Sequence, residues 1–108
     1  MRYTYKDERT RALIEDDKRL IRRYGPKAAQ GRDLRLAEIE THPNLAALLK
    51  SGSGRWHELD NRDGGTRNKK ISGDITGNQR ILLSEVKTPY GLTVEVEIDG
   101  IEDTHKKK

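Results

Sequence analysis

The sequence predicts an α+β domain in which two N-terminal helices pack on a mostly antiparallel, twisted β-sheet. Three observations support this prediction. Apolar residues recur at helical period within residues 8–41, residues 69–85 have the pattern of a β-hairpin, and apolar and polar residues alternate strictly over residues 92–98. Helices that precede a run of strands are typical of α+β proteins. The 108 residues fit one domain, residues 1–108.

The first two elements are expected to be a short strand and a helix. Residues 2–6 alternate, with Tyr3 and Tyr5 on one face, as in a strand. Asp7 suits the N-cap of a helix that runs from about residue 8 to residue 24. One face of this helix is apolar and the other carries most of its charges.

A second helix is expected to begin directly after the first. Gly25-Pro26 combines a residue that ends helices with one that suits a first helical position. The helix is predicted over residues 26–41, where His42-Pro43 stops it. Asn44 then caps a short helical turn over residues 45–49.

The hairpin of residues 69–85 is the strongest strand signal. Its turn is Thr76-Gly77-Asn78, and the apolar residues on both sides alternate so that Arg80 points to the face opposite the core. A strand at residues 55–59 and a loop at residues 61–70 precede it. The last strand follows a turn at residues 88–91, with a bulge expected at Gly100. Residues 51–54 are expected to form a flexible loop, and residues 106–108 a basic tail.

Composition restricts the classes of function. Hydrophobic residues make up 31% of the chain and charged residues 37%, with no Phe, so the core is expected to be thin. The net charge is +4, and it lies in residues 1–50, where 12 Lys and Arg face 8 Asp and Glu. Such a charge fits either plain solubility or attraction to a polyanion such as RNA.

Cysteine is absent, which excludes disulfides and thiolate chemistry. The three histidines lack metal-binding spacing, so we expect neither a metal nor another cofactor. No apolar run is long enough for a signal peptide or a membrane span, and we expect a soluble, cytoplasmic protein without membrane partners.

Four segments, in a fixed order, carry a family resemblance: Gly54-Arg55-Trp56-His57-Glu58-Leu59, then Gly73-Asp74-Ile75-Thr76-Gly77-Asn78-Gln79-Arg80-Ile81-Leu82-Leu83-Ser84-Glu85, then Val94-Glu95-Val96, then Ile101-Glu102-Asp103-Thr104-His105. In this order they resemble the HigB branch of the RelE/ParE toxin superfamily, the plasmid-maintenance killer proteins. Residues 18–25 resemble the first-helix pattern of the same branch. The resemblance spans nearly the whole chain.

The resemblance implies a RelE-like fold and the toxin of a type II toxin–antitoxin system. Such toxins are ribosome-dependent endoribonucleases, or mRNA interferases, which need no metal. A base removes the proton of a ribose 2′-hydroxyl, which attacks the adjacent phosphate, and an acid protonates the leaving oxygen. The implied partners are the ribosome, mRNA and an antitoxin, typically a helix-turn-helix protein.

Four residues match the family's catalytic positions. By resemblance, His57 is a base or phosphate ligand, His105 an acid or base, and Asp103 a residue that orients His105 or contacts the substrate. Arg80 matches the strand arginine that binds the scissile phosphate. Basic residues near these positions are expected to bind RNA: Arg55, Arg62, Arg67, Lys69, Lys70 and Lys106.

The chain departs from the family pattern at Thr104 and Gln79, where the family has aromatic residues. A non-catalytic protein of the same fold therefore remains an alternative, either a gyrase inhibitor like the ParE branch or a module that binds a partner. A general RNA-binding domain is a third reading. The few aromatic residues, one Trp and four Tyr, argue against base stacking.

Overall fold

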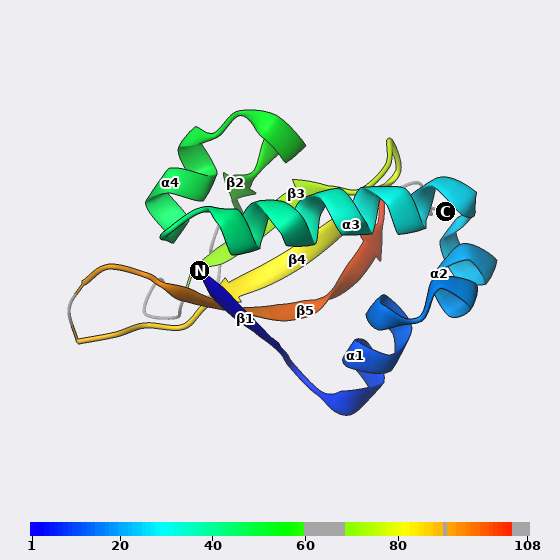
Figure 1. Cartoon of the computed structure of the whole chain (residues 1–108), viewed down its shortest axis with the longest axis horizontal. Coiled ribbons are helices and arrows are strands. Elements are labelled where there is room, and N and C mark those ends of the chain that lie inside the picture. The colour runs from blue at the N-terminus through cyan, green and yellow to red at the C-terminus, as the bar shows by residue number, and fades with distance from the viewer. Residues whose placement is uncertain (60–68, 90, 105–108) are drawn as a thin grey trace.

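The computed structural model describes residues 1–59, 69–89 and 91–104, which form four α-helices, one short 3₁₀ turn and five strands (Figure 1). The helices are α1 (Glu8–Glu15), α2 (Asp17–Tyr24), α3 (Pro26–Thr41) and α4 (Leu45–Lys50), followed by the 3₁₀ turn η1 (Ser53–Arg55). The strands are β1 (Arg2–Tyr5), β2 (His57–Glu58), β3 (Lys70–Asp74), β4 (Gln79–Glu85) and β5 (Glu95–Asp103).

The five strands form one mixed sheet in the order β1-β5-β4-β3-β2. Only the pairing of β1 with β5 is parallel, and the other three pairings are antiparallel. This arrangement confirms the predicted α+β class with a mostly antiparallel sheet. The predicted bulge is also confirmed, because Leu82 lies opposite Gly100 and Leu83 opposite Ile98, which leaves Asp99 as the extra residue.

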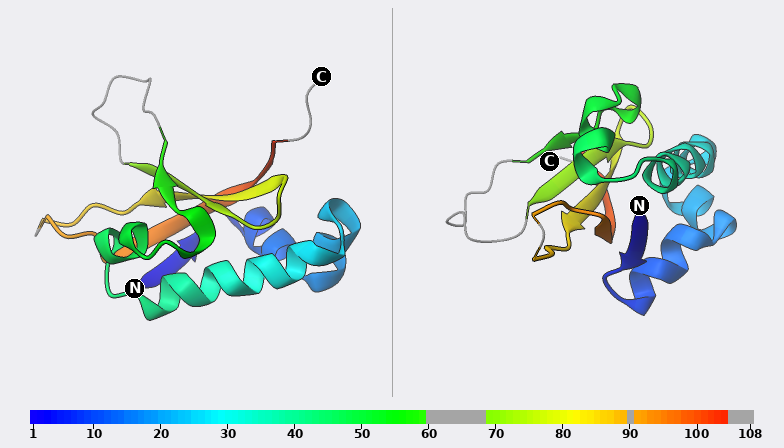
Figure 2. Two further views of the ribbon diagram at one scale, coloured as in Figure 1. Left: turned by 90° about the horizontal axis from the view of Figure 1, so that it is seen from above. Right: turned by 60° about the vertical axis from the view of Figure 1, so that its left-hand side comes forward.

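The helices cover one face of the sheet, and α3 runs across it (Figures 1 and 2). Gly31 of α3 is required by this packing, since a Cβ there would lie 2.0 Å from the backbone oxygen of Ile75. Every helix contributes to the core beneath. The fully buried apolar side chains include Ile14, Leu20, Ile39, Leu48, Ile71, Ile81, Leu83, Val96 and Ile98.

The single helix predicted over residues 8–24 is wrong in one respect, because it is two helices. Asp16 has an extended backbone conformation between them, and its side chain accepts hydrogen bonds from the backbone N–H groups of Lys18 and Arg19. Asp16 is therefore the N-cap of α2. The predicted cap at Asp7 is confirmed, as its carboxylate accepts from the backbone N–H of Thr10.

Strand lengths differ from the prediction at three places. The strand expected over residues 55–59 is only two residues long, because residues 53–55 form η1 in place of the expected flexible loop. The last strand begins at Glu95 rather than at residue 92. Most of the loop predicted at residues 61–70 lies outside the described residues. Within the described ranges, no helix is long and apolar enough to cross a membrane.

Candidate active site

The sheet face away from α3, here called the open face, carries the polar side chains of the hairpin. In β4, Ile81 and Leu83 are buried beneath the helices. Because side chains alternate along a strand, Arg80, which precedes Ile81, points to the open face. In β3, Asp74 lies directly opposite Arg80. The predicted hairpin, with Arg80 opposite the core, is therefore confirmed.

The Arg80 guanidinium is oriented by its own hairpin. Its Nε lies 3.0 Å from Oδ1 of Asp74, and its Nη1 donates to the carbonyl oxygens of Thr76 and Gly77, each at 3.3 Å. The Arg80 side chain is 25% exposed, and its Nη2 makes no hydrogen bond with the described part of the chain. One edge of a pre-oriented donor fork thus remains for a ligand such as a phosphate.

His57 lies on the same face as Arg80. It pairs with Ser72 of β3, whose position is two residues from that of Asp74. Two strand spacings and a two-residue step separate the backbones of His57 and Arg80 by about 12 Å. A substrate would therefore lie between the two groups, which do not contact each other directly.

The tautomer of His57 follows from its contact with the backbone. Its Nδ1 lies 2.9 Å from the carbonyl oxygen of Arg55. Because a carbonyl only accepts, Nδ1 must be the protonated nitrogen of this hydrogen bond. The exposed imidazole then presents Nε2 as a proton acceptor when neutral. This arrangement is chemically suited to a general base.

The C-terminal part of the predicted site is described only as far as Thr104. In the register of β5 against β4, Glu102 lies opposite Arg80, whereas Asp103 lies opposite Gln79 on the other face. His105 is outside the described residues, as is Lys106. The backbone N–H and the hydroxyl of Thr104 both donate to the carbonyl oxygen of Asn78, at 2.8 and 2.9 Å. The end of β5 is thus bonded to the turn beside Arg80.

The predicted RNA-binding cations that the structure describes each have a carboxylate nearby. Arg55 lies 3.5 Å from Asp74, Lys69 lies 3.4 Å from Glu58, and Lys70 lies 3.6 Å from Asp99. Asp74 and Asp99 therefore give the open face around Arg80 a mixed charge, whereas the Lys69–Glu58 pair lies on the face that the helices cover. The other two predicted cations, Arg62 and Arg67, lie outside the described residues.

Asp74 is a residue that the sequence reasoning did not assign to the site. Its two carboxylate oxygens face two arginines, Arg80 and Arg55, and its side chain is 24% exposed. The signal was present in the sequence, since Asp74 ends the strand that pairs with Arg80 across a short turn. The carboxylate fixes the direction of the Arg80 fork.

Comparison with solved structures finds a similar fold. The chain matches a YoeB/ParE toxin from Agrobacterium tumefaciens with a TM-score of 0.57 over 95% of this chain and 98% of that chain, at 13% sequence identity. No family model matches the sequence, and no curated protein does. At this identity the likeness is one of fold, and it confirms the predicted RelE-type fold.

Proposed function

We propose that this protein is the toxin of a type II toxin–antitoxin system and acts as a ribosome-dependent endoribonuclease. The observation that carries the proposal is the fold, which is that of a YoeB/ParE toxin over 95% of the chain. The geometry of the open face adds support, because Arg80 and His57 lie on it together.

In this mechanism Arg80 binds the scissile phosphate through the free edge of its guanidinium and stabilises the charge that develops on the phosphorane. His57 accepts the proton of the attacking 2′-hydroxyl through Nε2. His105 protonates the leaving 5′-oxygen. In support of that role, Thr104, the residue before His105, is bonded to the turn that carries Arg80.

The test is cleavage of mRNA on programmed ribosomes by the purified protein. Arg80→Gln should slow cleavage by roughly 10²–10³-fold, the scale of a lost charge-stabilising donor. Arg2→Gln is a matched control, because Arg2 is also a strand arginine paired with one carboxylate, at 3.2 Å from Glu95. Cleavage that is equal in the two variants would remove Arg80 from the mechanism.

The two histidines are tested in the same assay. His57→Ala and His105→Ala should each slow cleavage by about 10²-fold or more, as expected for a lost acid or base. His42→Ala is the control, since the His42 imidazole contacts its own helix end, with Nδ1 2.7 Å from the carbonyl oxygen of Glu38. A histidine whose loss leaves the rate unchanged has no catalytic role.

A non-catalytic toxin of the same fold is the second candidate, and two observations favour it. The acidic side chains of Asp74 and Glu102 lie on both sides of Arg80 and compete with a phosphate. The Thr104 hydroxyl is engaged with Asn78. A gyrase supercoiling assay beside the RNA assay separates the candidates. Inhibited supercoiling with intact mRNA would favour the ParE-like reading.

The proposed partner is an antitoxin of the helix-turn-helix type, and we propose the HigB branch of the superfamily for this chain. Expression of the protein alone should arrest growth, and co-expression with the adjacent reading frame should restore it. A neighbour without a helix-turn-helix pattern would argue against the HigB assignment and leave the toxin fold unaffected.

A further inference from the structure

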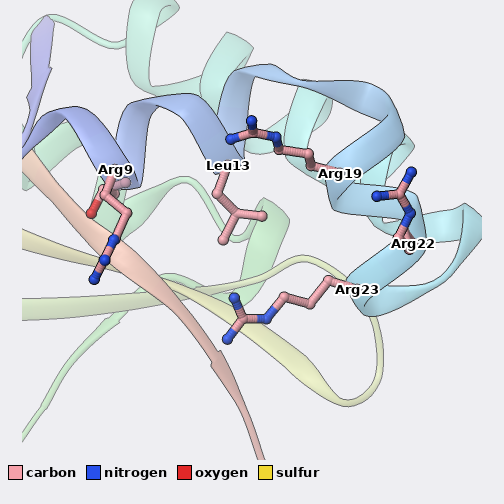
Figure 3. A pocket seen from close by; sticks show the side chains of 6 residues that line it. Arg9, Leu13, Arg19, Arg22 and Arg23 are labelled. Atoms are coloured by element: carbon pink, nitrogen blue, oxygen red, sulfur yellow. The ribbon is translucent and has the colours of Figure 1, made fainter.

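A second basic site lies between α1 and α2. An open cleft of about 600 Å³ there is lined by four arginines and two smaller residues (Figure 3). Leu13 of α1 lies in the middle of the cleft, and the arginine side chains surround it. The lining residues are Arg9, Thr10 and Leu13 from α1, and Arg19, Arg22 and Arg23 from α2.

Ion pairs balance little of the positive charge of this cleft, although Arg9 helps to lower the pKa of Asp7 and the Arg23 guanidinium lies 5.5 Å from the centre of the Tyr24 ring. Among the described residues, no carboxylate lies within ion-pair distance of Arg9, Arg22 or Arg23, and none lines the cleft. Arg19 is paired only loosely, 3.7 Å from Asp16. By contrast Arg11, also on α1 but outside the cleft, has both Glu8 and Glu15 within 3.4 Å.

Helix stability explains only part of this arrangement. Arg22 and Arg23 lie in the last turn of α2, where the helix dipole favours cations. Arg9, however, lies in the first turn of α1, where the same dipole disfavours a cation. The Arg9 side chain is exposed and lines the cleft with three other arginines, and its attraction to the Asp7 carboxylate offsets part of this cost. An anion bound in the cleft would remove this cost.

We propose that the α1–α2 cleft binds the phosphodiester backbone of RNA. Guanidinium groups match phosphate oxygens with two parallel hydrogen bonds, and several of them face one cleft here. An acidic protein helix is a poorer fit, because it needs a row of apolar anchors in its groove, and Leu13 is the only apolar one among the described residues that line this cleft. The choice of RNA as the polyanion rests on the proposed function.

The cleft would act as an anchor for RNA rather than as part of the chemistry. It belongs to the helices, whereas Arg80 and His57 belong to the strands. The helix α1 packs against β5, so both sites are parts of one rigid fold. RNA held at the cleft would raise the concentration of substrate near the open face without touching the reacting atoms.

The experiment measures binding of a 2′-O-methyl RNA oligonucleotide, which cannot be cleaved, by fluorescence anisotropy at several salt concentrations. Each phosphate contact contributes about 0.7 to the slope of log K against log salt for a single strand. The variant Arg9→Gln/Arg22→Gln/Arg23→Gln should therefore reduce this slope by about 2. The matched control, Lys18→Gln/Lys27→Gln/Lys50→Gln, removes the same charge from exposed lysines that do not line the cleft.

An equal fall in slope for both triple variants, or no fall in the cleft variant, would overturn the proposal. Binding of a poly-glutamate peptide that depends on the three arginines, with unchanged RNA binding, would assign the cleft to an acidic protein and also overturn it. If the triple variant loses its circular dichroism spectrum, the three single variants provide the test, each with a fall of about 0.7. Because the probe is not cleaved, the binding result does not depend on whether Arg80→Gln loses cleavage activity.

Discussion

Two arginines, Arg32 in the helices and Arg80 in the hairpin, show how differently one residue type is used in this fold. The Arg32 side chain is 7% exposed, and its three guanidinium nitrogens contact Asp33, Asp17 and the carbonyl oxygen of Ile14. These partners come from α1, α2 and α3. Arg32 thus joins three helices and has no nitrogen left for a ligand.

Arg80 has local partners and one free edge. Its side chain is 25% exposed, and its contacts come from the adjacent strand and from its own turn.

Burial alone would lower the pKa of Arg32, but the hydrogen bonds to Asp17 and Asp33 outweigh it and leave the pKa raised. The comparison teaches that the partners of Arg32 occupy all its nitrogens, whereas Arg80 keeps one partly exposed edge, the one that we propose for a phosphate.

The largest expected effect concerns the contact that connects these two regions. Gly31→Ala places a Cβ against the backbone oxygen of Ile75, next to the hairpin turn, so α3 must move. We expect a loss of about 3 kcal/mol in the free energy of unfolding, measured by urea denaturation. Gly77→Ala is the control, because no atom lies within 4 Å of a Cβ there, and it should be neutral. Equal effects would show that α3 does not depend on this close approach.

Arg32→Met is expected to have the next largest effect. The substitution retains most of the side-chain volume but leaves the buried carbonyl oxygen of Ile14 without its donor. The exposed carboxylates of Asp17 and Asp33 can be hydrated, so the loss should be about 2 kcal/mol, from the carbonyl and packing. Thermal and urea unfolding measure it. A change below about 0.5 kcal/mol would contradict the structural role of Arg32.

Tyr5, the last residue of β1, adds a pH dependence to the stability of the fold. Burial, together with Tyr3 and Glu15 nearby, raises the pKa of Tyr5 to about 12. The unfolded chain releases this proton at about pH 10, so the folded state binds more protons between pH 10 and 12. The full shift would correspond to about 2.7 kcal/mol, and solvent screening of this partly exposed group reduces the expected fall in stability to about 1 kcal/mol as the pH rises through this window. Tyr5→Phe should remove that fall in denaturation curves measured at pH 9 and 12, and an unchanged fall would contradict the assignment.

The smallest effect is expected for Arg80 itself. Because Arg80 makes one ion pair and bonds to exposed turn carbonyls, Arg80→Gln should change the free energy of unfolding by less than about 1 kcal/mol. The same variant is expected to lose most of the cleavage activity. A loss of stability as large as that of Arg32→Met would show that the two arginines do not differ in the way described.

Much of this architecture could be predicted from the sequence because local signals agreed. The Gly25-Pro26 junction, the Asn44 cap and the hairpin around Thr76 all appear as expected. The break at Asp16 was missed because the apolar stripe continues on both sides of it, and only the carboxylate that caps α2 reveals the end of one helix. The close approach that requires Gly31 is tertiary, and no local pattern announces it.

The candidate site was predictable only in part. Arg80 and the hairpin follow from alternation, and His57 shares their face because β2 pairs with β3. The role of Asp74 depends on cross-strand register, which the short turn indicates but periodicity alone does not. The cleft between α1 and α2 depends on the angle between two helices that were expected to be one, so its arginines were assigned to an ordinary charged face.

The parallel pairing of β1 with β5 has a consequence for synthesis in the cell. Arg2 pairs with Glu95, so β1 must wait for β5, which is synthesised long after it, before it can enter the sheet. Pairings between distant segments form slowly. A growing chain can complete its helices and its hairpin early but closes the sheet only after β5 has left the ribosome. Until then the strand β1 has no partner in the sheet.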